Sequence, residues 1–468
     1  MAGMGASLVT IMVAARLLPK DELGTFFLVM VVVQFVVIFS DLGLRNTAIK
    51  DLSSVLANSV EFLQTAHYLL TVTFLSAIAF CFALWLSMPF LKLLWSYENV
   101  HNQLAYAIPI AFLTAIVQII MSLLVGGKEF RKLSSLSAGI EILRAMLSTA
   151  GLLMGFGVTS LFWGMIASRI VGISAIWISM PSLFAFTLQH PRRTEFFKFG
   201  GWLYGGSLLS AGMVRCADAM LATYMGTAAL AIYSAAMQTP IFMQRLFESM
   251  RPALLGYVAA NHSTAQEQQG EIVRILTAVL AVAALCLIVF SHPIMTMLYS
   301  EGYSSGVPIM QALSAWMAFA LVNYFYSIIL IGRGKAREAL ILTVPQLLIM
   351  LLTTEWLVPK YGGFGAANAL IITSCMGNII GAKIIAGDDR KTWWALTTMF
   401  LRAALPLLLL LIAAIQMKLS FFSLLSLGGV MVWLLVVLKV LTASDIASVQ
   451  TILSRRIRQA SVRSTTST

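Results

Sequence analysis

Long apolar segments recur along the whole chain and constrain its fold more than any other feature. Hydrophobic residues make up 59% of the sequence, and charged residues only 11%. A helix needs roughly 20 apolar residues to cross the ~30 Å hydrocarbon core of a bilayer. Only helices and closed barrels satisfy their backbone hydrogen bonds there, and these segments lack the alternation of barrel strands. The sequence therefore predicts an all-α, polytopic membrane protein.

We predict about fourteen transmembrane helices from these segments. The connections between them are short, so neither face of the membrane has room for a soluble catalytic domain. The predicted spans are 3–18, 24–43, 64–88, 104–125, 137–155, 160–182, 200–222, 229–250, 273–291, 307–330, 339–358, 365–386, 396–416 and 422–442.

The sequence also repeats itself at an offset of about 207 residues. At that offset Gly127-Lys128 aligns with Gly334-Lys335, and Asp41 aligns with Glu248. The first six spans thus match the next six, which predicts two parallel repeats with a substrate path between them, as in many transporters. The predicted units are a six-helix bundle at 1–186, its repeat at 187–395, two additional helices at 396–443 and a basic tail at 444–468.

Loop charges predict the orientation. If the N-terminus is cytoplasmic, the outer loops contain few basic residues (Lys20, Lys92, Lys360 and Lys418), and the inner loops and the tail contain most of the others. This asymmetry follows the positive-inside rule and places both termini in the cytoplasm. Basic residues beside anionic lipid also account for the net charge of +12, so we expect membrane lipids and no nucleic acid as partners.

Two stretches of sequence resemble a known family. The segment 15–26 (ARLLPKDELGTF) precedes the second predicted helix, and Asp41-Leu42-Gly43 closes it. In the second half, Asp218 is followed by the segment 231–236 (AIYSAA). These motifs resemble the polysaccharide exporters, the O-antigen and lipid-linked oligosaccharide flippases of the multidrug/oligosaccharidyl-lipid/polysaccharide superfamily, which also contains the MATE transporters. The resemblance covers nearly the whole chain and implies a MATE-like fold.

The resemblance implies a function. Such a protein moves a polyprenyl-pyrophosphate-linked glycan, such as an O-antigen or exopolysaccharide repeat unit, from the inner to the outer leaflet of the cytoplasmic membrane by alternating access. No cofactor is expected. Coupling to protons or sodium, and docking of polysaccharide polymerase machinery, are left open at this point. Three alternatives remain: a flippase for a peptidoglycan precursor, an ion-coupled multidrug exporter of the same superfamily, and a membrane-embedded polysaccharide polymerase or ligase. The short outer loops disfavour an enzyme.

Ionisable residues inside the predicted spans are candidate functional residues, because each costs at least ~2.5 kcal/mol to insert. Arg169 has no acidic residue within one turn of its own helix, so its guanidinium is the best candidate to bind pyrophosphate. Arg215 and Arg144 are further candidates for a cationic lumen. Each lies three residues from an acidic residue, Asp218 and Glu141 respectively, so a structural ion pair is the alternative interpretation.

Acidic residues are candidates for ion coupling. Asp218 lies deepest in a predicted span, and Asp41 and Glu141 lie nearer the inner ends of theirs. Each could instead serve structural pairing. The five histidines are scattered and the four cysteines lie in apolar spans, so no metal site is expected.

Overall fold

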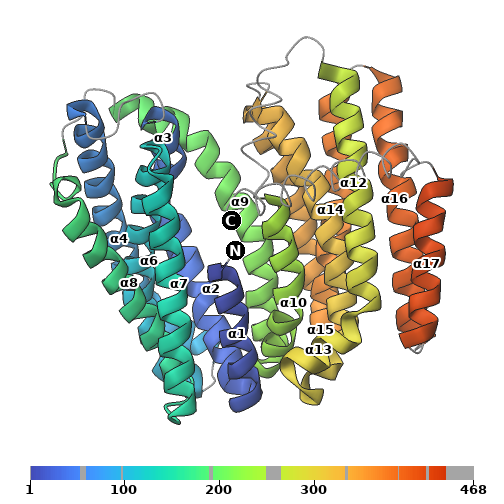
Figure 1. Cartoon of the computed structure of the whole chain (residues 1–468), viewed down its shortest axis with the longest axis horizontal. Coiled ribbons are helices and arrows are strands. Elements are labelled where there is room, and N and C mark those ends of the chain that lie inside the picture. Colours follow the sequence, from blue (N-terminus) through green and yellow to red (C-terminus); the bar gives the residue numbers. More distant parts are fainter. Residues whose placement is uncertain are drawn as a thin grey trace, which may run out of the picture. The chain divides into compact units, whose positions relative to one another are not determined.

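A computed structural model describes residues 2–52, 59–95, 98–188, 193–248, 265–332, 336–387, 389–417 and 421–438. These residues form helices joined by short turns, and the described part contains no strand. The all-α prediction is therefore confirmed (Figure 1).

Every predicted span overlaps an observed helix. The α-helices are α1 (Ala2–Leu17), α2 (Lys20–Asp41), α3 (Leu44–Leu52), α4 (Val60–Leu94), α5 (Glu98–Gln103), α6 (Ala107–Gly126), α7 (Phe130–Leu153), α8 (Thr159–Ser179), α9 (Arg193–Met225), α10 (Thr227–Glu248), α12 (Ala265–Val289), α13 (Ser291–Tyr299), α14 (Val307–Gly332), α15 (Ala336–Ala386), α16 (Arg390–Gln416) and α17 (Phe421–Val437). Three short 3-10 helices join them: η1 (Leu104–Tyr106), η2 (Pro181–Leu183) and η3 (Glu301–Gly306).

Among the described residues, eight helices are long and apolar enough to cross a membrane. A ninth span results if α12 and α13, bent by 61° at their junction, count as one. The number of fourteen spans is compatible with this structure and stays a prediction. The sequence did not predict the short helices α3 and α13, since neither is long enough to span a bilayer.

The longest helix, α15, contains two predicted spans and a break between them. Pro359 removes a backbone donor near the break, and Gly362 has φ 56° and ψ −135°, outside the helical region. A residue with a side chain is strained at that positive φ, whereas glycine is not. The Thr373 hydroxyl lies 3.5 Å from the Met350 sulfur, on the other side of the break, so the chain reverses direction here without a long loop. This agrees with the boundary predicted between 358 and 365.

Helix α2 begins and ends where its sequence favours helix boundaries. Asp21 and Glu22 occupy its first turn, where acidic side chains interact favourably with the helix dipole. At the other end Leu42 and Gly43 adopt positive φ values of 47° and 76°, which stop the helix and start α3. The Asp41-Leu42-Gly43 motif is thus a helix terminus.

The described chain divides into two compact units. The first contains Met1–Phe242, Ile294–Ile309 and Ala336–Thr373, and the second contains the rest. In the first unit α7 packs against both α8 and α1, and α6 packs against α2, α3 and α4. In the second unit α12, α16 and α17 pack together. The predicted bundle boundaries at 186 and 395 stay a prediction, and the predicted tail (444–468) lies outside the described residues.

Candidate functional site

Glu141 and Arg144 form an ion pair that a residue of another helix completes. Both lie on α7, three positions apart, and the Arg144 Nη2 atom is 2.7 Å from Glu141 Oε2. Arg144 Nε donates to the same oxygen at 3.1 Å. The Ser7 hydroxyl on α1 also donates to Glu141 Oε2, at 2.8 Å, and accepts a hydrogen bond from Arg144. The sequence-predicted pair therefore also connects two packed helices, α1 and α7.

Arg169 is the third charged member of this group. It lies on α8, which packs against α7, and it is within electrostatic reach of both Glu141 and Arg144. Its only hydrogen bond within the described part of the chain is from Nη1 to the carbonyl of Met165, at 3.0 Å. A guanidinium has five N–H donors, so the other donors of Arg169 have no hydrogen-bond partner among the described residues. We call Ser7, Glu141, Arg144 and Arg169 the charge cluster; its formal charge is +1.

Arg215 and Asp218 form a second ion pair, on α9. The Arg215 Nη1 atom is 2.7 Å from Asp218 Oδ2, and the Asp218 side chain is only 4% exposed. The other carboxylate oxygen, Oδ1, is buried and has no hydrogen-bond partner among the described residues. The fully buried Tyr233 of α10 lies within electrostatic reach of Asp218, and its hydroxyl is also unpartnered there. An unsatisfied buried carboxylate calls for an explanation, such as an ion or a water molecule.

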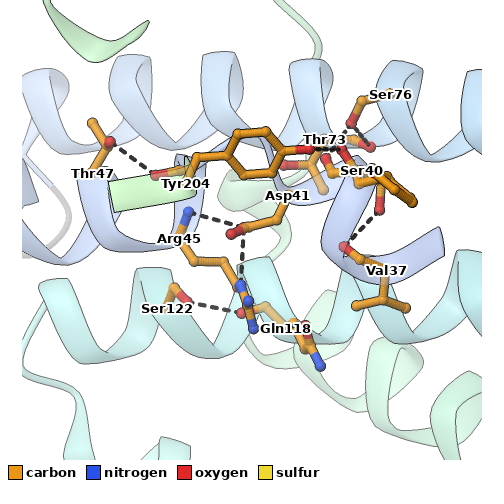
Figure 2. Close-up of polar contacts among 12 residues, drawn as sticks. Val37, Ser40, Asp41, Arg45, Thr47, Thr73, Ser76, Gln118, Ser122 and Tyr204 are labelled. Carbon is orange, nitrogen blue, oxygen red and sulfur yellow. Dashed lines mark hydrogen bonds and ion pairs between the residues drawn. The ribbon is translucent and has the colours of Figure 1, made fainter. Parts of the chain in front are cut away.

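Asp41 is the centre of a third polar network, at the junction of α2 and α3 (Figure 2). Arg45 donates from Nε to Asp41 Oδ1 at 2.9 Å, and from Nη1 to the Gln118 side chain at 2.8 Å. The Tyr204 hydroxyl of α9 donates to the Phe39 carbonyl at 3.2 Å. Figure 2 shows Tyr204 and Arg45 beside Asp41. The network therefore connects α2, α3, α6 and α9.

The structure separates the six predicted residues into three groups, namely the charge cluster, the Arg215–Asp218 pair and the network of Asp41. Glu141, Arg144 and Arg169 share the charge cluster, whereas no hydrogen bond or ion pair among the described residues connects Arg215 to Arg144 or Arg169. Arg144 is already bonded to Glu141 and Ser7. Within the charge cluster, Arg169 is therefore the arginine with fewer hydrogen bonds among the described residues.

Sequence reasoning missed several polar partners. Ser7, Gln118 and Tyr204 come from helices distant in sequence, and no spacing rule connects them to Glu141 or Asp41. Arg45 was detectable, because it lies four residues after Asp41, the spacing of one helical turn. No group of three or more His, Cys, Asp or Glu residues within the described ranges has the arrangement to hold a metal ion.

Comparison with known sequences identifies the family. The sequence model described as "Polysaccharide biosynthesis protein" matches residues 13–308, more than half of the chain. The succinoglycan biosynthesis transport protein ExoT of Rhizobium meliloti is 26% identical over 239 residues. That alignment covers 50% of this chain and 46% of ExoT, so the match spans about half the length of the relative.

Comparison with solved structures identifies the fold. The lipid II flippase MurJ, in an inward closed conformation, matches with a TM-score of 0.72 and 15% identity over 92% of this chain and 95% of MurJ. An inward-facing multidrug transporter of the MATE family matches with a TM-score of 0.61 and 14% identity, over 82% of this chain and 95% of its own. These matches confirm the predicted MATE-like fold of the superfamily.

Proposed function

Because the chain belongs to the polysaccharide biosynthesis protein family, we propose that it is a flippase for a polyprenyl-pyrophosphate-linked oligosaccharide. It moves the head group from the inner to the outer leaflet of the cytoplasmic membrane, with both termini in the cytoplasm. The observation that carries this proposal is the uncommitted guanidinium of Arg169, half-buried in a predicted transmembrane helix. An intramembrane arginine without a full set of partners is costly, and an anionic ligand is a physical reason to keep it.

The diphosphate is the chemical group that the charge cluster suits. A guanidinium donates two parallel hydrogen bonds to phosphate oxygens and remains charged at all physiological pH values. Glu141 fixes Arg144 and limits the formal charge of the cluster to +1, so that a dianionic head group is attracted without being held too tightly to be released. The polyprenyl tail stays in lipid while the head group crosses between the two repeats.

Transport of this kind needs two conformations and no covalent chemistry. The parallel repeats supply two bundles that can alternate about a central path. The relatives named above are transporters and flippases, which supports a protein that is not an enzyme. Asp218 is the residue that we propose for coupling to protons or sodium, because its Oδ1 atom is buried and lacks a hydrogen-bond partner among the described residues. A polymerase that consumes the flipped glycan is the expected partner.

The first test is the distribution of lipid-linked glycan between leaflets in cells depleted of this protein. Permeant and impermeant probes measure the inner and outer pools. We expect accumulation in the inner leaflet and loss of surface polysaccharide. An unchanged distribution contradicts the flippase function, and dye efflux driven by an ion gradient would then support the multidrug exporter instead.

The residue-level test is Arg169→Ala in the same cells. If Arg169 binds the diphosphate, this variant reduces export at a normal protein level, and Arg169→Lys restores part of it. The matched control is Arg402→Ala, which removes an exposed arginine from α16, one of the two additional helices. Normal export by Arg169→Ala would contradict the assignment of this residue.

A further inference from the structure

One end of the first unit holds several contacts between residues before position 100 and residues after position 220. The early residues come from the α1–α2 turn and the end of α4. The late residues come from the end of α9, the start of α10, and the α13–η3 turn. All of them belong to the first unit. We call this set of contacts the clasp.

The centre of the clasp is the contact between α2 and α10. The Thr227 hydroxyl donates to Asp21 Oδ1 at 3.1 Å, and Thr227 is only 4% exposed. Gly24, one turn further along α2, faces the Thr227 backbone. A Cβ atom at position 24 would lie 1.8 Å from the Thr227 carbonyl oxygen and 2.4 Å from its carbon. These are backbone atoms, so a rotamer change cannot relieve the overlap. The two helix ends meet this closely only because residue 24 is glycine.

A second contact lies at the ends of α4 and α9. The indole Nε1 of Trp95 donates to the Thr223 hydroxyl at 3.0 Å, and Trp95 is only 4% exposed. Trp95 directly follows α4, and Thr223 is in the last turn of α9. A buried indole nitrogen needs a partner, so this hydrogen bond exists only while the two helix ends stay together.

The third part of the clasp joins the α1–α2 turn to the α13–η3 turn. Arg16 donates to the carbonyl of Met297 in the last turn of α13, where a positive charge interacts favourably with the helix dipole. Lys20 places its ammonium 5.6 Å from the ring centroid of Tyr303. Both basic side chains therefore hold the same turn of the later segment.

We infer that the clasp is the outer gate of the transporter, closed in this conformation, and that Gly24 permits its closure. This inference rests on the proposed function and orientation, which put the α1–α2 turn on the outer face. Helices α2 and α10 are the second helix of each repeat, so their ends meet where the two bundles must separate to release substrate outward. The polar contacts involve single side chains, which can part and pair again in each cycle.

Gly24 can be tested separately from the polar contacts. In a chain whose four native cysteines are replaced by serine, Asp21→Cys and Thr227→Cys place two thiols across the clasp. We expect a thiol oxidant to join them in the Gly24 protein and to join far fewer in the Gly24→Ala variant. The matched control is Gly5→Ala on α1, because a Cβ atom there has no neighbour within 4 Å. Equal crosslinking in the Gly24→Ala and Gly24 proteins would overturn the role of Gly24.

The same cysteine pair tests the gate without a substitution at Gly24. The oxidised pair should abolish export of lipid-linked glycan, and a reductant should restore it. Normal export by the crosslinked protein would overturn the gate. If depletion of the protein leaves the glycan distribution between leaflets unchanged, the proposed substrate is refuted. The dependence of crosslinking on Gly24 would still test the clasp by itself.

Discussion

Removing Arg215 tests whether its ion pair with Asp218 is a structural requirement of the fold. The substitution Arg215→Met keeps most of the length of the side chain and removes its charge. It leaves the Asp218 carboxylate, whose side chain is 4% exposed, without its hydrogen bond from Arg215 and with no described partner for Oδ1. The opposite substitution, Asp218→Asn, leaves a neutral amide that still accepts from Arg215.

The expected magnitudes differ between the two changes. Breaking a buried ion pair by removing one partner costs about 3–5 kcal/mol. The lower end applies here because the Arg215 side chain is 31% exposed and the pair is therefore only partly buried, so we expect Arg215→Met to lower the free energy of unfolding by about 3 kcal/mol. Asp218→Asn should cost about 1 kcal/mol, since the partly exposed Arg215 keeps a neutral hydrogen-bond acceptor.

The assay is equilibrium unfolding of the purified protein in mixed micelles, applied to both single variants and to the double variant. The double variant should be more stable than Arg215→Met alone, because the buried charge that lost its partner is gone. Additive losses, or a larger loss for Asp218→Asn than for Arg215→Met, would refute the reasoning. Additivity would mean that Arg215 is not the group that neutralises Asp218, and that another partner, such as the sodium ion proposed above, does so instead.

Two further predictions concern the ends of helices. Arg45→Lys should lower the free energy of unfolding by about 1–2 kcal/mol, because lysine cannot reach both Asp41 and Gln118 as the guanidinium does. The control Arg131→Lys, at an exposed position of α7, should have no measurable effect. Equal losses in the two variants would contradict the role of Arg45 in joining Asp41 to Gln118. Asp389 caps α16, where hydrogen bonds from the Thr392 hydroxyl and then from the Lys391 amide hold the pKa of this carboxyl below its usual value. A carboxyl whose pKa is lower in the folded state stabilises the protein at pH values above its unfolded-state pKa, and this stabilisation is lost as the pH falls through its folded-state pKa. Protection of the backbone amides in the first turn of α16 from hydrogen exchange should therefore fall below about pH 4. No such fall should occur in Asp389→Asn.

The site was only partly predictable, and particular residues show why. Glu141 and Arg144 were recognised as a pair because three-residue spacing puts them on one helical face. Arg169 was recognised because an unpaired charge in an apolar span is costly. Their meeting in one cluster, with Ser7 added from α1, depends on how α1, α7 and α8 pack, and sequence spacing carries no information about that packing.

The sequence by itself determined the class of the protein, because hydrocarbon imposes helices on any long apolar segment and the repeat shows at a fixed offset. It also indicated the break near Gly362 and the family. The tertiary structure decided what the motifs do. Asp21 and Gly24 belong to a motif that resembles the family. Only the approach of α10 shows that the Thr227 carbonyl packs against Gly24, where a Cβ atom would overlap it. Such contacts join residues about two hundred positions apart, and only packing in three dimensions determines which of them meet.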